Sequence, residues 1–229
     1  MAEASTLPSV VIEERTFISQ VYGWMAVGLL LTGGMAVFLA GNPVLLTQIV
    51  GTKVLFYGLM IVELGLVIAL AGWAQNMSSG AALACFLGYA ALNGITFSMI
   101  FLVYTGASIA STFFVTAGTF GVMSLYGYTT KTDLTTMGNI CFMGLIGIII
   151  ASLVNFFFKN AMVYWITTYL GVLVFVGLTA YDTQKIKNLN VAGDAEMEKK
   201  EAIVGALTLY LDFINLFLDL LRIMGKRRE

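Results

Sequence analysis

The residues of this chain best suited to chemistry are acids in apolar surroundings. Asp212 and Asp219 stand inside Leu209–Arg222, a run that is otherwise largely apolar. A carboxylate at the centre of a bilayer costs about 2.5–3.5 kcal/mol on insertion scales. Asp212, Asn215 and Asp219 occupy positions i, i+3 and i+7 of a helix, so the three side chains share one face. We predict that this face points inward, which makes Asn215 and Asp219 secondary candidates for an ion pathway beside Asp212.

Two further acids occupy comparable positions. Glu63 lies near the middle of the apolar stretch 54–74, and Asp182 follows the stretch 161–181. A single connection separates Asp182 from Asp212, so their helices are expected to be neighbours. Two carboxyl groups in a partly dry site cannot easily both ionise, and they titrate as a unit. Loss of a shared proton would drive the helices apart or admit a cation such as calcium, which prefers oxygen ligands. This pattern predicts a proton-sensitive gate.

Each acid also has a structural interpretation. Asp219 could pair with Arg222 one turn later, near the membrane surface. Asp182 could be solvated at the start of a charged connection, and Glu63 could form a hydrogen bond to a neighbouring helix. Asp212 has no basic residue near it along its own helix, which favours a functional role for this residue.

Composition excludes several other kinds of site. The chain has no histidine, so histidine-based metal sites, a Ser-His-Asp triad and a histidine pH switch are excluded. Its two cysteines, Cys85 and Cys141, lie in separate apolar stretches without CxxC spacing, and we interpret both as small hydrophobic residues. The formal net charge of -1 offers no basic face to a nucleic acid. No permanently bound cofactor is expected.

The composition as a whole is typical of an integral membrane protein. Hydrophobic residues make up 59% of the 229 residues and charged residues 11%, against about 25% charged residues in an ordinary soluble domain. About 20 helical residues cross the hydrocarbon core of a bilayer. Seven apolar stretches are long enough to do so: 17–40, 54–74, 80–104, 109–127, 136–158, 161–181 and 203–221. Because helices satisfy their own backbone groups in lipid, we predict an all-α integral membrane protein with seven transmembrane helices.

The connections between these stretches are short, and none is long enough to hold a second domain. We therefore predict a polar N-terminal tail over 1–16, a single membrane domain over 17–225 and a basic C-terminal tail over 226–229. The N-terminal tail lacks the basic start and cleavage site of a secretory signal. The longest connection is expected over 183–202. Close helix packing is predicted where small residues recur, at Gly80, Ala84 and Gly88, at Gly118 and Gly121, and at Gly144 and Gly147.

The distribution of basic residues leaves the orientation open. A seven-span arrangement places six Lys and Arg residues on each side of the membrane, so the positive-inside rule gives a tie. If the last stretch did not cross the membrane, ten Lys and Arg residues would lie on one side and two on the other. This distribution favours six spans and a re-entrant seventh segment. Stretch length favours seven spans. We predict seven, with the polar last helix shielded inside the bundle.

Three segments resemble the Bax inhibitor family, whose members are also called transmembrane Bax inhibitor motif or lifeguard proteins. The segments are Tyr126–Gly138, Tyr181–Lys187 and Leu209–Phe217, and they occur in the family's order. The resemblance extends over nearly the whole chain, and the length and short tail resemble the prokaryotic branch. It implies a bacterial inner-membrane protein in which six helices wrap around a central C-terminal helix.

The resemblance also implies an activity, because members of this family are described as pH-sensitive calcium leak channels. The family's paired aspartates match Asp182 and Asp212, and any bound calcium would lie at these two residues. The family's glutamate on the second membrane span matches Glu63. In some relatives an arginine at the far end of the second span pairs with the aspartate that ends the sixth span, and this pair closes the pore. In this chain the second span is the stretch 54–74 and the sixth is 161–181. The corresponding segment Trp73–Asn76 has no basic residue, so that lock is absent here.

Two other functions are left open by the sequence. Bacterial relatives have been linked to a quality-control protease of the membrane, so the chain could be a non-transporting partner of such a protease. Two aspartates on neighbouring membrane helices would also suit an intramembrane aspartyl protease. The Gly-x-Gly-Asp pattern of presenilin-like proteases is absent, because Tyr210-Leu211 precedes Asp212. We predict a channel for calcium and protons in the lipid bilayer, and no enzyme.

Overall fold

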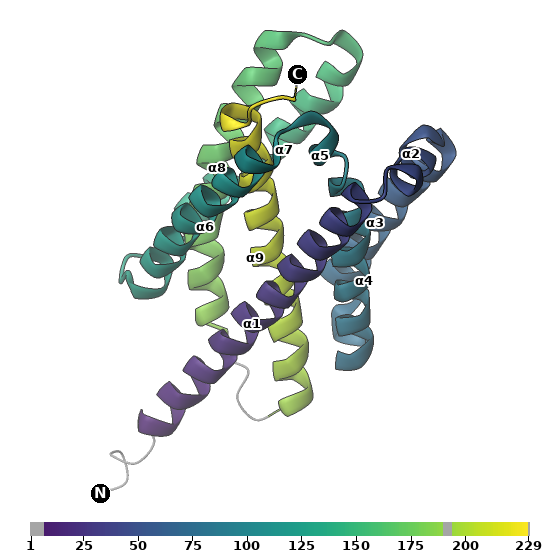
Figure 1. Cartoon of the computed structure of the whole chain (residues 1–229). Helices are drawn as coiled ribbons and strands as arrows, with labels where there is room; N and C mark the ends of the chain where they lie inside the picture. Colours follow the sequence, from purple (N-terminus) through teal and green to yellow (C-terminus); the bar gives the residue numbers. More distant parts are fainter. Residues whose placement is uncertain (1–6, 190–193, 229) are drawn as a thin grey trace, which may run out of the picture. The chain divides into compact units, whose positions relative to one another are not determined.

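The computed structural model describes residues 7–189 and 194–228, and the regular structure in that part of the chain is helical. The elements are α1 (Leu7–Ala40), α2 (Pro43–Gly51), α3 (Lys53–Trp73), the short 3₁₀ helix η1 (Ala74–Asn76), α4 (Ser79–Phe97), α5 (Ile100–Val103), α6 (Gly106–Thr129), α7 (Thr135–Phe158), α8 (Ala161–Lys187) and α9 (Ala195–Met224) (Figure 1). The prediction of an all-α protein is confirmed.

Six of the described helical segments are long and apolar enough to cross a membrane. They are Arg15–Ala40, Ser79–Val103, Gly106–Thr129, Thr135–Phe158, Ala161–Lys187 and Ala195–Met224. The predicted stretch 54–74 is not among them, because the apolar segment of α3, Tyr57–Trp73, is shorter than the others. The last helix, which the charge count made doubtful, is one of the six. The count of seven stays a prediction.

The chain forms two compact units. Unit 1 contains α1 to α5 and the part of α9 up to Tyr210. Unit 2 contains α6, α7, α8 and the part of α9 from Leu211 onward. Asp182 and Asp212 both belong to unit 2, whereas Glu63 belongs to unit 1.

Several helices extend beyond the predicted apolar stretches, because helix propensity continues where hydropathy falls. α1 begins at Leu7, inside the predicted tail 1–16. α8 continues to Lys187 and α9 starts at Ala195, so the predicted bounds of the connection, 183–202, are wrong. The short helix α2 was not predicted either.

The early start of α9 has a local cause. The residues over 195–202 are mostly Ala, Glu, Met and Lys, which are strong helix formers. Asp194 caps the start, since its Oδ1 accepts hydrogen bonds from the backbone N–H groups of Glu196 and Met197 at 2.9 and 3.1 Å. The Glu196 carboxylate in turn accepts hydrogen bonds from the N–H and hydroxyl groups of Ser79 at 2.6 and 2.9 Å. These bonds join the start of α9 to the start of α4 in unit 1.

The core of unit 1 contains a polar network centred on Tyr210. This residue is fully buried, and its hydroxyl lies 2.7 Å from Oγ1 of Thr32 in α1. Nδ2 of Asn93 in α4 donates to the same hydroxyl at 3.0 Å, and Thr32 Oγ1 donates to the Ala90 carbonyl at 2.8 Å. Gly94 permits the approach of α4 to α1, because a Cβ there would lie 2.6 Å from the Thr32 backbone oxygen. The network therefore satisfies both buried hydroxyl groups.

In unit 2, α8 packs against both α6 and α7. The second part of α9 joins them through aromatic and aliphatic contacts. The Phe213 ring centroid lies 5.5 Å from that of Phe113 and 5.4 Å from that of Phe120, both in α6. Phe175 of α8 packs in one buried cluster with Leu216 of α9. This part of α9 is thus enclosed by apolar side chains from its own unit.

The predicted close packing of small residues is confirmed at one position. A Cβ added at Gly144 would lie 3.0 Å from Cγ2 of Val174 in α8. Among the residues that the structure describes, no neighbouring atom would lie within 4 Å of a Cβ added at the other predicted glycines, which are Gly80, Gly88, Gly118, Gly121 and Gly147. The prediction was wrong there because spacing does not show which helix face meets a neighbour.

Replacing Tyr210 with Phe is expected to destabilise the protein, because Thr32 and Asn93 lose their shared partner. Hydrogen bonds between membrane helices contribute about 0.6 kcal/mol on average and up to about 1.7 kcal/mol, so a loss of about 1–2 kcal/mol is expected. Thermal unfolding in detergent measures it as a lower melting temperature. Tyr169→Phe is the matched control, since Tyr169 is 54% exposed and its ring stacks on Trp165. Equal melting temperatures for the two variants would contradict this role of Tyr210.

Candidate functional site

The structure brings two of the predicted site residues together. Asp182 lies in the last turns of α8 and Asp212 in the second part of α9, and they are 8% and 4% exposed. The two carboxyl groups lie close enough to interact with each other. A carboxylate has no proton to donate, so a hydrogen bond between two carboxyl groups requires that one of them is protonated. Whether this pair shares a proton stays a prediction.

The polar surroundings of the pair leave part of it without a partner. Within the described part of the chain, no group donates a hydrogen bond to the buried Oδ2 of Asp212. The ammonium group of Lys185, one turn further along α8, attracts the Asp182 carboxylate. The Cys141 thiol of α7 lies close enough to both aspartates for their charges to act on it. A buried carboxylate oxygen without a donor is costly when charged, so the site favours a bound proton or an incoming cation.

Two glycines allow α8 to approach its neighbours beside Asp182. Gly127 of α6 lies directly against the backbone carbonyl of Ala180, and a Cβ there would overlap the carbonyl oxygen. Gly138 of α7 lies against the ring of Tyr181 in the same way. Both glycines belong to the first of the three motif segments found in the sequence. That segment therefore positions the turn of α8 that carries the aspartate.

A glutamine fixes the same turn to the loop between α6 and α7. Oε1 of Gln184 accepts a hydrogen bond from the Leu134 N–H group at 2.8 Å, and its Nε2 donates to the Thr132 carbonyl at 2.8 Å. Sequence reasoning missed this residue and the two glycines as supports of the site, although all three stand inside the motif segments. Their place in those segments was the available signal. Cys141 carried no such signal and was interpreted only as a small hydrophobic residue.

Asp219 is held by an ion pair on its own helix. Nη1 of Arg222 lies 2.7 Å from Oδ1 of Asp219, and the aspartate is 6% exposed. The carboxylate lies directly against Gly171 of α8, where a Cβ would overlap Oδ2. The Arg222 guanidinium lies 5.9 Å from the centroid of the Tyr164 ring. The structural interpretation of Asp219, a pair with Arg222, is confirmed, and a role in an ion pathway stays a prediction.

The remaining candidates have local partners. Nδ2 of Asn215, which is half-buried, donates to the Leu211 carbonyl on its own helix at 2.8 Å. Glu63 accepts a hydrogen bond from Oγ1 of Thr96 at 3.0 Å. This bond links α3 to α4 in unit 1, as the structural interpretation of Glu63 predicted.

The acid pair offers too few ligands for tight binding of a metal ion. Among the described residues, no group of three or more Cys, Asp or Glu side chains is arranged to hold a metal ion. Asp182 and Asp212 offer two carboxyl groups, whereas Ca²⁺ takes about 6–8 oxygen ligands. Water would have to supply most of the ligands of any calcium ion at this position.

Comparison with known proteins supports the resemblance found in the sequence. The model of a family described as "Inhibitor of apoptosis-promoting Bax1" matches residues 14–229. The chain is 56% identical over 217 residues to the inner membrane protein YbhL of Escherichia coli K12, covering 93% of each chain. It is 46% identical over 221 residues to an uncharacterized protein of Borreliella burgdorferi, covering 96% of this chain and 95% of the other. A Deinococcus radiodurans protein is 42% identical over 228 residues, covering 99% and 96%. Neither the family description nor these names state an enzymatic activity.

The location of the chain follows from its helices and from these relatives. It is an integral multi-pass protein of the bacterial inner membrane. Its outer surface agrees with this, because Phe156, Phe157 and Phe158 of α7 are 69–78% exposed. Such a surface is unfavourable in water, whereas lipid chains are an apolar solvent for it.

Replacing Gly127 with Ala is expected to disturb the packing of α6 against the turn of α8 that carries Asp182, because the added methyl group overlaps the Ala180 carbonyl. Overpacking of this kind costs about 1–3 kcal/mol, and thermal unfolding in detergent should show a lower melting temperature. Gly121→Ala on the same helix is the matched control, since a Cβ there would meet no described atom within 4 Å. Its greater helix propensity should leave stability unchanged or slightly raised. Equal melting temperatures for the two variants would contradict the proposed close contact.

Removal of Arg222 is expected to leave the Asp219 carboxylate buried without its partner. Arg222→Gln should lower the free energy of unfolding by about 1–3 kcal/mol, the usual cost of an orphaned charged group. Adding Asp219→Asn should recover much of this loss, because no unpaired charge then remains. A double-mutant cycle of equilibrium unfolding in detergent measures the coupling. Strictly additive effects would show that the pair contributes nothing.

Proposed function

We propose that this chain, which belongs to the Bax inhibitor family, is a cation leak channel that opens when Asp182 and Asp212 lose a shared proton. Calcium is the proposed cargo and is not a resident cofactor. One observation carries the proposal: the buried carboxyl groups of Asp182 in α8 and Asp212 in α9 lie close enough to interact with each other. One of their oxygens, Oδ2 of Asp212, has no donor among the described residues.

The protonated pair would hold the channel closed. With one proton bound, the two groups form a hydrogen bond that ties the end of α8 to the second part of α9. Without it, two like charges at about 4 Å repel by about 4 kcal/mol at an effective dielectric constant of about 20. Lys185 offsets part of this repulsion on the side of Asp182. The remainder is relieved if the helices separate or if a cation enters between the carboxylates.

Calcium suits this role because its ligands are oxygens and its coordination is flexible. Two carboxylates can replace only part of its water shell, so the ion is attracted but not retained. A leak pathway needs this balance, since binding must be strong enough for entry and weak enough for release.

The proposed architecture places α9 at the centre of seven spans, with the apolar segment of α3 as the seventh. α9 buries 67% of its most apolar window, against 6–33% for the other five candidate spans. A helix that is buried to this extent can carry acids that a lipid-facing helix could not. Closure rests on the shared proton, because Trp73–Asn76 offers no basic residue to pair with Asp182.

Calcium flux into proteoliposomes, measured across a pH series, tests the proposal. Wild-type flux should rise as the pH rises through the titration of the pair, by up to about tenfold per pH unit for a one-proton gate. The variant Asp182→Asn/Asp212→Asn should give low flux without pH dependence, because amides neither titrate nor attract a cation. Glu198→Gln removes an acid from outside the site and is the control.

A double variant that keeps the flux and pH dependence of the wild type would overturn this mechanism. Folding of each variant is checked by its melting temperature and its elution volume in detergent. Reconstituted amounts are matched, so a low flux cannot arise from a lower protein content.

A further inference from the structure

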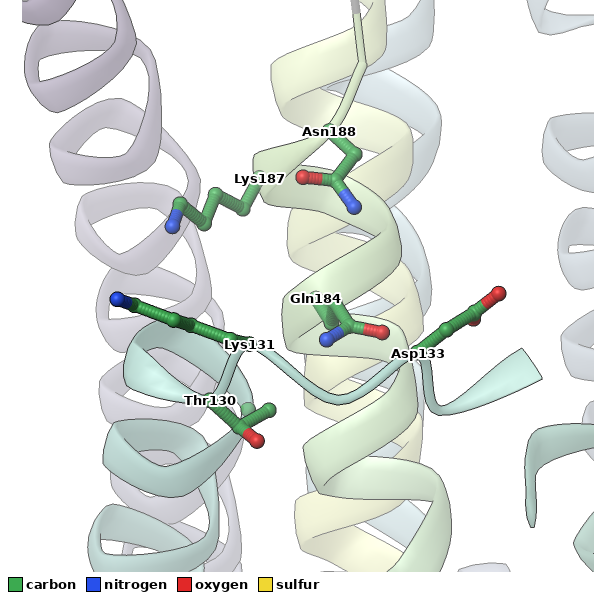
Figure 2. Close-up of a pocket in the computed structure, with 7 residues that line it drawn as sticks. Thr130, Lys131, Asp133, Gln184, Lys187 and Asn188 are labelled. Carbon is green, nitrogen blue, oxygen red and sulfur yellow. The ribbon is translucent and has the colours of Figure 1, made fainter. Parts of the chain in front are cut away.

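A polar pocket lies where α6 and α8 both end in unit 2. It has a volume of about 240 Å³, and Figure 2 shows the side chains that line it together with Gly127: Thr130, Lys131, Asp133, Gln184, Lys187 and Asn188. The sequence singled out none of these as a site. Both helices are candidate spans that finish at this end. The pocket is therefore at the level where helix ends meet lipid headgroups.

Two ammonium groups give the pocket its charge. Lys131 and Lys187 extend toward the same side in Figure 2. Nζ of Lys187 donates to the Tyr128 carbonyl at 3.0 Å and lies 4.8 Å from the centroid of the Tyr128 ring. These contacts hold one of the two cations in place. Two ammonium groups on one small cavity give it a positive potential that attracts anions.

The acid in the lining has hydrogen-bond partners of its own. The Asp133 carboxylate points away from both lysines in Figure 2. Its Oδ1 accepts hydrogen bonds from the N–H and hydroxyl groups of Thr135 at 2.9 and 2.6 Å, and these bonds hold the pKa of Asp133 below its ordinary value. The Asp133 carboxylate thus caps the first turn of α7, where the helix dipole stabilises its negative charge.

The walls of the pocket are formed before any ligand arrives. Gln184 binds the loop backbone on both sides of Asp133, at Thr132 and Leu134. This fixes the loop that carries Lys131 to the helix that carries Lys187. A preformed site loses less entropy on binding than one that must be ordered.

A simpler role for the lysines is compensation of the negative ends of two helix dipoles. Lys187 lies in the last turn of α8, as does Lys185. That role requires only that the cations lie near the helix ends. It does not account for a cavity into which Lys131 and Lys187 both face while Lys185 lies outside its lining.

We propose that this pocket binds a phosphate group, carried either by an anionic phospholipid headgroup or by free phosphate. Two ammonium groups, the Thr130 hydroxyl and the Asn188 amide match the oxygens of a phosphate. Basic pockets between membrane helices bind anionic headgroups in this manner. The volume is below the range of about 300–1,000 Å³ that drug-sized ligands occupy, and it fits a single phosphate group. The site does not depend on the proposed channel function.

The test uses the full chain in nanodiscs of phosphatidylcholine with increasing fractions of phosphatidylglycerol. Native mass spectrometry counts the lipids retained on release from the disc. The wild type should retain phosphatidylglycerol in preference to phosphatidylcholine. Each of Lys131→Gln and Lys187→Gln should weaken retention about fivefold, and the double variant about thirtyfold. Lys185→Gln removes the same charge from the same helix end and should retain phosphatidylglycerol as the wild type does.

A second arm separates the two sources of phosphate. Inorganic phosphate is titrated into the protein in phosphatidylcholine discs and followed by phosphorus NMR line broadening. Broadening that Lys131→Gln/Lys187→Gln removes supports free phosphate as a ligand, and retention of phosphatidylglycerol without broadening supports the lipid. The proposal is overturned if the double variant, with a wild-type melting temperature, retains phosphatidylglycerol normally and the wild type shows no phosphate broadening. Equal losses in Lys185→Gln and the double variant would also overturn it, because they would indicate a general charge effect.

Discussion

A carboxyl group buried among apolar helices needs a proton, a cation or a hydrogen-bond donor, and this requirement organises unit 2. The unit meets it in two ways. Asp219 is neutralised by Arg222 on the same helix, at 2.7 Å. Asp182 and Asp212 lie close to each other, and we propose that they share a proton. Arginine stays charged at every physiological pH, so the partner of Asp219 does not depend on a bound proton. The second, as proposed, lasts only while the proton is bound, so it would depend on pH.

Close approach of helix backbones makes this arrangement possible. Gly127 and Gly138 remove the side chains that would otherwise hold α6 and α7 away from α8 beside Asp182. Gly171 does the same beneath the Asp219 carboxylate, on the face that α8 turns toward α9. Packing of this kind substitutes for the hydrophobic effect, which gives no drive for helices to associate within lipid. The position of the acids is therefore set by residues that carry no functional group.

The sequence could predict the acids because their cost in lipid is high and their order along the chain makes neighbours of two helices. Periodicity placed Asp212 and Asp219 on one buried face, and chain order placed Asp182 beside Asp212. The supporting residues could not be predicted in the same way. Gly80 and Gly88 have the spacing of a packing motif but no close neighbour among the described residues, whereas Gly127 and Gly138 have no such spacing and lie in contact. A glycine reveals its role only through the atom that faces it, and that atom comes from a distant part of the chain.

The last turns of α8 combine three tasks within a few residues. Asp182 faces the second part of α9, Gln184 holds the backbone at Thr132 and Leu134, and Lys187 reaches the Tyr128 carbonyl. A helix segment this short moves as one body unless it bends, because its own backbone hydrogen bonds resist local distortion. A displacement that separates the two aspartates must therefore carry the glutamine and the lysine with it, or break their bonds to the loop. The acid pair and the polar pocket share one rigid element, so neither can rearrange without a cost at the other.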